Sequence, residues 1–233
     1  MESSRVNESM RSNLSAIEES IAAACVRAGR NRESVTLIGV SKTFPASLVD
    51  GAVSLGVRDI GENRVQELRA KVDEVQTSPR WHLIGHIQSN KAKEAARLAD
   101  VIHTVDSVHL AERLAKEADQ LQKRLDVLIQ VNVGGEEQKS GVSPNAAERL
   151  LSELLPLGAL RVRGLMTIPP IASPDRTRAF FAQLRDLRDR LQTVAGGDIF
   201  TELSMGMSDD FPMAIEEGAT MIRVGRALFG DRG

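Results

Sequence analysis

The sequence predicts an α/β protein with the fold of a single (β/α)8 TIM barrel, preceded by one extra N-terminal helix. Eight short apolar segments rich in Val and Ile recur along the 233 residues, as buried parallel strands do. Segments with the apolar spacing of amphipathic helices separate them, so one repeating unit takes roughly 25 residues. Because no linker or low-complexity segment interrupts the series, we expect residues 1–233 to form one domain.

A helix over residues 6–28, ended by Gly29, precedes the first strand. The strands are expected over residues 34–41, 56–63, 80–87, 101–107, 126–133, 160–168, 199–205 and 221–228. Helices are expected over residues 45–56, 64–76, 90–100, 107–125, 143–155, 173–192 and 209–219. Several of these helices begin with Ser, Asp or Asn, which favours an N-cap, and Gly56 and Gly218 stand where helices end.

A doubly wound open sheet is the main alternative to the barrel. That fold carries a glycine-rich turn after its first strand, and no such turn follows residues 34–41. The number of expected strands also favours a closed barrel.

Composition and charge argue against several classes of protein. The net charge is −2 and no basic block occurs, so neither a nucleic-acid surface nor a polybasic membrane surface is expected. No apolar run reaches the roughly 18 residues of a membrane span. The acidic N-terminal segment does not suit a targeting peptide, and the lone Cys25 rules out an internal disulfide. We therefore expect a cytoplasmic protein, and we expect it to be a monomer.

In such a barrel, function lies at the C-terminal ends of the strands. The polar residues expected there include Lys42, Glu62, Asn63, His86, Gln88, Asp106, Ser107, Asn132, Thr167, Ser204, Ser208 and Arg226. Lys42 is the most unusual of them, since it leaves a buried apolar strand and enters a turn closed by Pro45. A lysine that merely reaches solvent is the ordinary interpretation, and a lysine that reacts with a carbonyl is the functional one.

The loops after the seventh and eighth strands indicate a phosphate site, as in many barrels. The first loop reads LSMGMSDD and offers Ser204, Gly206 and Ser208. In the second, RVGRALFG, Gly225 allows close backbone approach, and the N–H groups of Gly225 and Arg226 begin a helix whose dipole favours an anion. Taken alone, such residues more often belong to plain turns and a plain helix cap.

A lysine at the barrel mouth beside a phosphate site matches the needs of pyridoxal 5'-phosphate (PLP). This cofactor takes a lysine for its imine, a phosphate cradle and a partner for its pyridine nitrogen. Arg223 precedes Gly225 by two residues on one strand, so its side chain shares the inward face and is placed to reach the ring nitrogen. The alternative is a sugar-phosphate isomerase or aldolase in which Lys42 forms a Schiff base with substrate. That chemistry calls for a carboxylate pair, for which Glu62 and Asp106 are available.

Six motifs in order resemble the pyridoxal phosphate homeostasis protein family, also known as the proline synthase co-transcribed homologues. They read VTLIGVSKTFP, GENRVQE, WHLIGHIQSNK, VNVGGEEQKSG, LRVRGLMTIPP and ELSMGMSDDFPMAIEEGATMIRVGRALFG, and they run from Val35 to Gly230. The resemblance implies a fold-type III PLP barrel like the N-terminal domain of alanine racemase. It implies that Lys42 carries PLP as an internal aldimine, that Arg223 faces the pyridine nitrogen and that Asn63 lies near the ring hydroxyl.

For the phosphate, the resemblance implies contacts from Ser204 and from the backbone of Gly225 and Arg226. Some relatives have a small hydroxyl residue at the position of Arg226. A backbone contact would be preserved by that difference, whereas a side-chain contact would be altered.

Two features argue against an ordinary PLP enzyme. A protonated Arg223 beside the pyridine nitrogen makes the ring a poor electron sink. Alanine racemases tolerate this arginine but use a second domain and a catalytic tyrosine, whereas this chain ends soon after the eighth strand and contains no tyrosine. The possible replacement acids or bases are Lys139, His82, His86 and His103. We predict a PLP-binding homeostasis protein that supplies apo-enzymes with little or no turnover, and a racemase-like enzyme is the alternative.

No metal site is predicted. His82 and His86 have the i, i+4 spacing of a helical metal pair, but on a strand they lie roughly 13 Å apart, too far for one ion. We expect His82 to be a packed core histidine and His86 to line the cofactor pocket. Lys139 follows the fifth strand and is either a solvated loop lysine or a secondary PLP contact.

Overall fold

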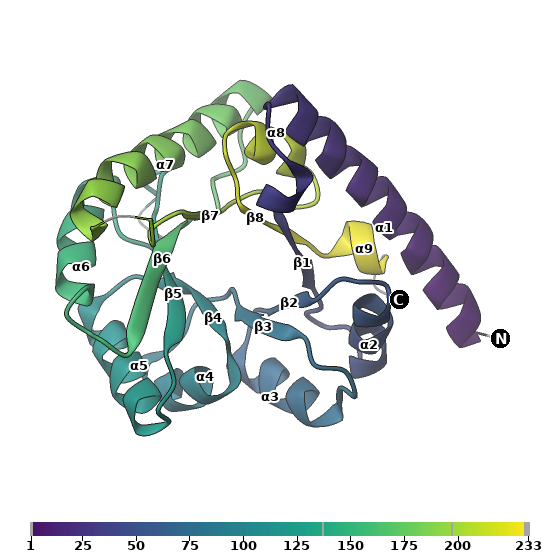
Figure 1. Ribbon diagram of the computed structural model, residues 1–233, viewed down its shortest axis with the longest axis horizontal. Helices are drawn as coiled ribbons and strands as arrows, with labels where there is room; N and C mark the ends of the chain where they lie inside the picture. Colours follow the sequence, from purple (N-terminus) through teal and green to yellow (C-terminus); the bar gives the residue numbers. More distant parts are fainter. Residues whose placement is uncertain (1, 137, 197, 231–233) are drawn as a thin grey trace.

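The computed structural model describes residues 2–136, 138–196 and 198–230. Eight parallel strands form a closed barrel in chain order, and β8 pairs with β1 (Figure 1). The predicted barrel with its N-terminal helix is therefore confirmed. That residues 1–233 form one domain stays a prediction, because both termini lie outside the described residues.

The strands are short, and together they form the barrel wall. They are β1 (Thr36–Val40), β2 (Asp59–Glu62), β3 (Arg80–Leu83), β4 (Val101–Val105), β5 (Leu125–Gln130), β6 (Leu160–Met166), β7 (Glu202–Ser204) and β8 (Met221–Val224). Each falls within one residue of an expected segment, because strands covered on both faces need continuous apolar runs that the sequence displays.

Helices surround the barrel (Figure 1). They are α1 (Glu2–Arg27), α2 (Ala46–Ser54), α3 (Val65–Glu74), α4 (Ala92–Leu98), α5 (Val108–Gln120), α6 (Ala147–Leu154), α7 (Pro174–Ala195), α8 (Phe211–Glu216) and α9 (Arg226–Phe229). Short 3-10 turns over η1 (Arg32–Ser34), η2 (Ser89–Lys91) and η3 (Pro144–Ala146) precede β1, α4 and α6. None of the helices among the described residues is long and apolar enough to cross a membrane.

The helix ends agree with the sequence better than the helix starts do. Gly56 and Gly218 take φ values of 103° and 98° just after α2 and α8, a conformation that glycine adopts without steric cost. Among the described helices, only α5 has a side-chain N-cap, in which the Leu110 N–H donates to Ser107 Oγ at 3.3 Å. Ser143 and Ser173 occupy the N-cap positions of η3 and α7 as expected but make no side-chain cap hydrogen bond, and the N-cap of α8 is Asp210 instead of Asp209.

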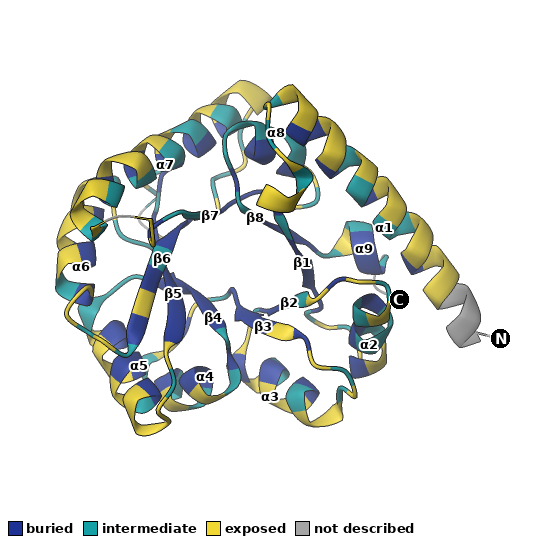
Figure 2. Ribbon diagram, in the orientation of Figure 1, coloured by how far each residue is buried: buried dark blue, intermediate teal, exposed yellow. Residues whose placement is uncertain are grey.

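Two different cores result from this arrangement. The large apolar core lies between the strands and the helices, and Figure 2 shows buried residues along the strands and on the inward faces of the helices. Inside the barrel a second apolar cluster consists of Ile38, Leu128, Met166 and Met221. Buried polar side chains share the interior with it, and each of them needs a hydrogen-bond partner.

Candidate PLP site at the barrel mouth

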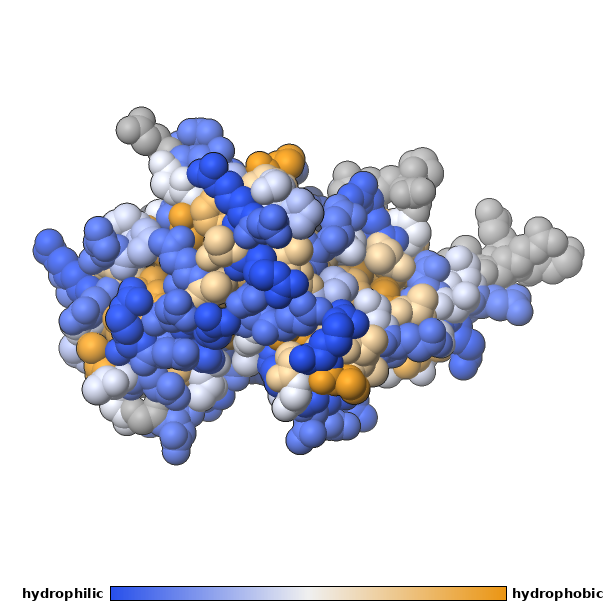
Figure 3. Space-filling model, turned by 90° about the horizontal axis from the view of Figure 1, so that it is seen from above, coloured by the Kyte–Doolittle hydropathy of each residue, from blue (hydrophilic) through white to orange (hydrophobic). Residues whose placement is uncertain are grey.

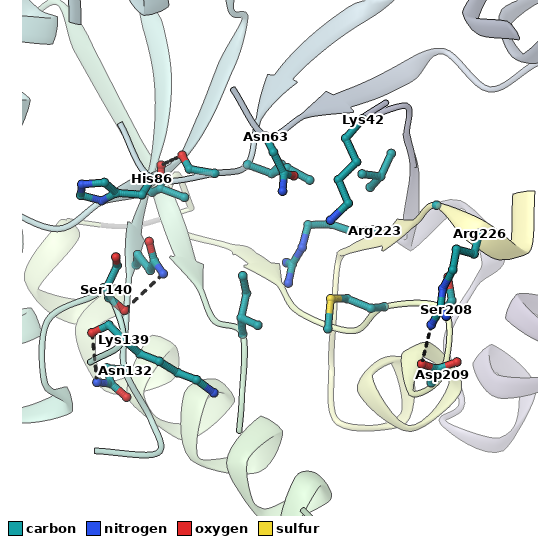
Figure 4. A pocket seen from close by; sticks show the side chains of 18 of the residues that line it. Lys42, Asn63, His86, Asn132, Lys139, Ser140, Ser208, Asp209, Arg223 and Arg226 are labelled. Atoms are coloured by element: carbon teal, nitrogen blue, oxygen red, sulfur yellow. Dashed lines mark hydrogen bonds and ion pairs between the residues drawn. The ribbon is translucent and has the colours of Figure 1, made fainter. Parts of the chain in front are cut away.

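A cavity of about 560 Å³ opens at the C-terminal ends of the strands, where a barrel is expected to carry its function. Four basic side chains line it, Lys42, Lys139, Arg223 and Arg226 (Figure 4). Asp209 is the one acidic side chain among its described lining residues. This excess of positive charge favours an anionic ligand.

Lys42 follows β1 and extends into the cavity (Figure 4). The next residue, Thr43, has a φ of 68°, a left-handed conformation that costs a β-branched residue roughly 1–3 kcal/mol. The turn is held by the Phe44 N–H, which donates to the Ser41 carbonyl at 3.0 Å, and by packing of the Phe44 and Phe229 rings 5.2 Å apart. Among the described residues, the amine of Lys42 makes no hydrogen bond or ion pair, and it extends into the cavity without a polar partner.

Behind Lys42, a buried ionic cluster fixes the backbone on the outer side of the barrel wall. Lys71 of α3 forms an ion pair with Glu62 of β2 and donates to the Ser41 carbonyl at 2.5 Å. The Ser41 hydroxyl also donates to Glu62, at 2.5 Å. Burial raises the pKa of the Glu62 carboxyl, and the bonds from Lys71 and Ser41 oppose that rise. This cluster anchors the residue next to Lys42.

Arg223 of β8 lies at the floor of the cavity and is only 3% exposed. Its Nη1 donates to Ser204 Oγ at 2.6 Å, and its Nη2 donates to the Thr167 carbonyl at 2.9 Å. Burial lowers the pKa of the Arg223 guanidinium to about 10, so the group is protonated at neutral pH. A fixed cationic donor of this kind suits an acceptor such as a pyridine nitrogen.

Ser204 lies below the cavity rather than at its wall. It is fully buried, is not among the described lining residues, and its hydroxyl is bonded to Arg223 and, at 2.9 Å, to His103 Nδ1. The phosphate contact predicted for Ser204 stays a prediction; here the strand turns its side chain into the barrel interior, toward Arg223 and His103. Of the two serines in this loop motif, Ser208 is the one that lines the cavity.

The two glycines of the predicted phosphate cradle lie at positions where a side chain would be crowded. Gly206 has a φ of 90°, and a Cβ there would lie 2.6 Å from the Ala214 Cβ. Gly225 lines the cavity, and a Cβ there would lie 3.3 Å from the Val40 carbonyl oxygen. Glycine at these two positions allows close packing, of Gly206 against α8 and of Gly225 against Val40 of β1.

The helix after Gly225 differs from expectation. Only four residues form α9, a single turn, so its dipole is much smaller than the sequence analysis assumed. The Arg226 side chain adds charge instead: it is 63% exposed, and its Nη2 lies 3.4 Å from Asp209 Oδ2. An anion in the cradle would compete with Asp209 for this guanidinium.

Three further predicted residues line the cavity. Asn63 follows β2, and its side chain lies between His86 and Lys42 (Figure 4). His86 lines the cavity as expected, with its Nδ1 3.9 Å from Asp106 Oδ2. Lys139 lies in the loop after β5, with its Nζ 2.5 Å from Glu136 Oε2.

The carboxylates proposed for the sugar-phosphate alternative are not near the reactive amine. Neither Glu62 nor Asp106 is among the described residues that line the cavity. Glu62 is bound to Lys71 on the outer side of the wall, and Asp106 lies beside His86. The geometry therefore does not favour an isomerase or aldolase.

Sequence reasoning missed Gln130. It lies at the end of β5 and lines the cavity, its amide nitrogen donates to the Ser140 carbonyl at 3.2 Å, and its Oε1 has no partner among the described residues. The available signal was a polar residue at an inward position of the apolar run DVLIQVNV. The Gln130 Oε1 atom, buried and without a partner among the described residues, could accept a hydrogen bond from a ligand in the cavity.

His82 is a buried histidine inside the barrel, as predicted, and it bonds to Asp59 and His103. Within the described part of the chain, no group of three or more His, Cys, Asp or Glu side chains is placed to hold a metal ion.

Fold and site together define the general class of protein. Residues 12–233 match the family model of the alanine racemase N-terminal domain, and the chain belongs to that family. Alanine racemase of Clostridium difficile 630 superposes with a TM-score of 0.75 at 18% identity, over 97% of this chain and 56% of that one. At this identity, the likeness shows the shared fold alone.

More particularly, the chain belongs to the pyridoxal phosphate homeostasis protein family. The member from Aquifex aeolicus (strain VF5) is 44% identical over 94% of this chain and 96% of its own length. The member from Escherichia coli (strain K12) is 39% identical over 94% of this chain and 95% of its own. PipY of Synechococcus elongatus PCC7942, solved with PLP bound, is 40% identical, has a TM-score of 0.83 and covers 95% of this chain and 100% of its own. The family predicted from the six motifs is thus confirmed.

Proposed function

We propose that this chain binds PLP reversibly through Lys42 and acts in PLP homeostasis in the cytoplasm, with little or no catalytic turnover. One observation carries the proposal. The Lys42 amine, without a polar partner among the described residues, extends into a basic cavity whose floor is the protonated Arg223. A relative solved with PLP, PipY, shares 40% of the sequence and supports the same ligand here.

The cavity offers a group for each part of this ligand. PLP supplies an aldehyde that bonds reversibly with an amine, and Lys42 is the amine. Arg223 would donate to the ring nitrogen, and Asn63 would approach the ring hydroxyl. The phosphate would be held by the loop backbone at Gly225 and by the side chain of Arg226.

The electrostatics support storage over turnover. A pKa of about 10 keeps Arg223 protonated, so it donates to the ring nitrogen and the ring remains a weak electron sink. Of the histidines considered as bases, His82 and His103 are buried inside the barrel. His86 and Lys139 remain as candidates at the cavity, and each already lies beside a carboxylate. A racemase-like activity would have to use one of these two.

We further propose that recipients are apo PLP-dependent enzymes and that the chain acts as a monomer. The cavity opens to solvent at the barrel end, and a bond between an amine and an aldehyde is exchanged by an incoming amine, which supports release. The face seen in Figure 3 is mostly hydrophilic with separate apolar spots, which supports a monomer.

The test combines a transfer assay with a turnover assay. Chain loaded with PLP should restore activity to an apo PLP-dependent enzyme and should racemise alanine no faster than free PLP does. Lys42→Ala should take up no covalent PLP and transfer none, whereas Lys139→Ala should still load. Substantial racemisation by the loaded chain, abolished by His86→Ala or Lys139→Ala, would favour the racemase-like alternative.

A further inference from the structure

A continuous chain of hydrogen bonds crosses the barrel interior and ends on the arginine at the cavity floor. Its members come from five strands, β2, β3, β4, β7 and β8, and are Asp59, His82, His103, Ser204 and Arg223. The successive contacts are Asp59 Oδ1 to His82 Nε2 at 2.8 Å, His82 Nδ1 to His103 Nε2 at 2.9 Å, His103 Nδ1 to Ser204 Oγ at 2.9 Å and Ser204 Oγ to Arg223 Nη1 at 2.6 Å.

The chemistry of its two ends fixes the direction of every bond in this chain. Arg223 can only donate, so Ser204 accepts from it and must send its single O–H to His103 Nδ1. A neutral His103 then carries its proton on Nε2 and donates to His82 Nδ1. His82 in turn carries its proton on Nε2 and donates to Asp59, whose carboxylate only accepts. Burial lowers the pKa of both imidazoles, which fits one N–H on each.

We propose that Asp59, His82, His103 and Ser204 are positioning residues that orient Arg223 and set the hydrogen bond it donates into the cavity. The inference rests on the proposed function, since its readout is bound PLP. Asp59 fixes the tautomers of two histidines, they fix the Ser204 hydroxyl, and that hydroxyl holds Arg223 Nη1. The Thr167 carbonyl holds Nη2 at 2.9 Å, so the guanidinium has one defined orientation.

Asp210 is the carboxylate whose charge raises the pKa of the Arg223 guanidinium against the effect of burial, and it is unchanged in the variants below, so Asp59 acts through the hydrogen bonds. Asp59 is 20% exposed at the opposite end of the barrel from the cavity, and hydrogen bonds aligned in one direction polarise one another. Arg80 and Asp100 also act on His82, one lowering and one raising the pKa of its imidazole. Arg80 and Asp100 are unchanged in the variants below, so these two residues do not account for a difference between one variant and another.

A network that merely satisfies buried polar groups would stabilise the fold without tuning the ligand. Nitrogen-15 NMR of the four histidines in the unmodified protein tests the bond directions on which the proposal depends, and the variants below then separate the proposal from a merely structural network. The proposal requires both His82 and His103 to be protonated at Nε2. The Nδ1 tautomer at either residue would overturn it.

Variants then test the effect on the ligand, read as the dissociation constant of PLP and the pH titration of its visible absorbance. Asp59→Leu and His103→Leu should each weaken PLP binding about tenfold, as expected for one charge-assisted hydrogen bond, and shift the titration. The double variant should be no weaker than either single one, because both break the same chain. Asp59→Asn, which can still accept from His82, should restore most of the affinity.

Glu202→Gln is the matched control, since Glu202 is a partly buried carboxylate at the start of β7, at the same end of the barrel, and accepts from Thr220 Oγ1 at 2.6 Å outside the hydrogen-bond network. It should leave affinity and titration unchanged even if stability falls. If the Asp59 and His103 variants behave like this control, or if their single effects on affinity multiply in the double variant, the inference is overturned while the proposed function stands. A wild-type protein without covalent PLP would overturn the proposed function, and the inference with it.

Discussion

Replacing Lys71 with methionine tests the ionic cluster behind the reactive turn. Lys71 Nζ pairs with Glu62, whose side chain is fully buried, and holds the Ser41 carbonyl next to Lys42. Methionine keeps an apolar stem but removes the charge, so Glu62 is left buried with one hydrogen bond from Ser41. Removal of one partner from a buried ion pair costs about 3–5 kcal/mol. We predict a loss of this size in the free energy of unfolding at pH 8.

The loss should depend on pH in a defined direction. Burial already raises the pKa of Glu62 above its ordinary 4.5, and loss of Lys71 removes an interaction that opposed this rise. A group whose folded pKa exceeds its unfolded pKa contributes stability below the unfolded value and loses it as pH rises through the folded one. The difference between Lys71→Met and wild type should therefore be smallest near pH 5 and largest at pH 8.

Urea unfolding at both pH values measures the effect. Glu62→Gln/Lys71→Met removes both charges and should lose less stability than Lys71→Met alone at pH 8. Lys91→Met is the control, because Lys91 Nζ lies 3.8 Å from Glu94 in a partly exposed pair that contributes at most about 1 kcal/mol. A cost below about 1 kcal/mol for Lys71→Met at pH 8, or an equal cost at both pH values, would refute the reasoning.

Three other predictions follow from single contacts. Burial holds the pKa of His103 well below 6.5, so the unfolded protein binds a proton there that the folded protein does not. His103 should therefore contribute about 1 kcal/mol to the fall in stability from pH 6.5 to 5.5, and His103→Leu should remove that contribution in urea titrations, leaving the part due to the lowered pKa of His82. Arg226 pairs with Asp209 beside the cradle, so Arg226→Thr should weaken the binding of PLP roughly two- to fivefold in calorimetry and leave the binding of unphosphorylated pyridoxal unchanged. Asp209→Asn should strengthen the binding of PLP, because it frees the Arg226 guanidinium for the phosphate. Gly206→Ala should cost about 2 kcal/mol or more, since its Cβ would lie 2.6 Å from the Ala214 Cβ, and should cost more than Gly29→Ala, which has a positive φ but open space.

The barrel was predictable because its strands are apolar along their whole length and recur at a regular spacing. The same regularity placed Lys42 and Arg223 correctly, since strand ends converge at one mouth and alternate residues share a face. These inferences need only positions within one strand or one repeat, and such positions are visible in a sequence.

Contacts between distant strands were not predictable in the same way. His103 and Ser204 are 101 residues apart and meet only because closure of the barrel brings β4 and β7 to face each other across its interior. Ser204 was therefore assigned to the phosphate by its loop motif, whereas the register of β7 turns it inward. Gln130 offered only a polar residue at an inward position of an apolar run, and that signal does not say whether the side chain reaches the cavity or is paired within the barrel.

The most direct test of the central claim is mass spectrometry of the protein after saturation with PLP, borohydride reduction and digestion. A reversible link to Lys42 predicts one stable pyridoxyl addition on the peptide that contains Lys42, lost in Lys42→Ala and retained in Lys139→Ala. An unmodified Lys42 peptide at saturation, or a label that persists in Lys42→Ala, would contradict the account.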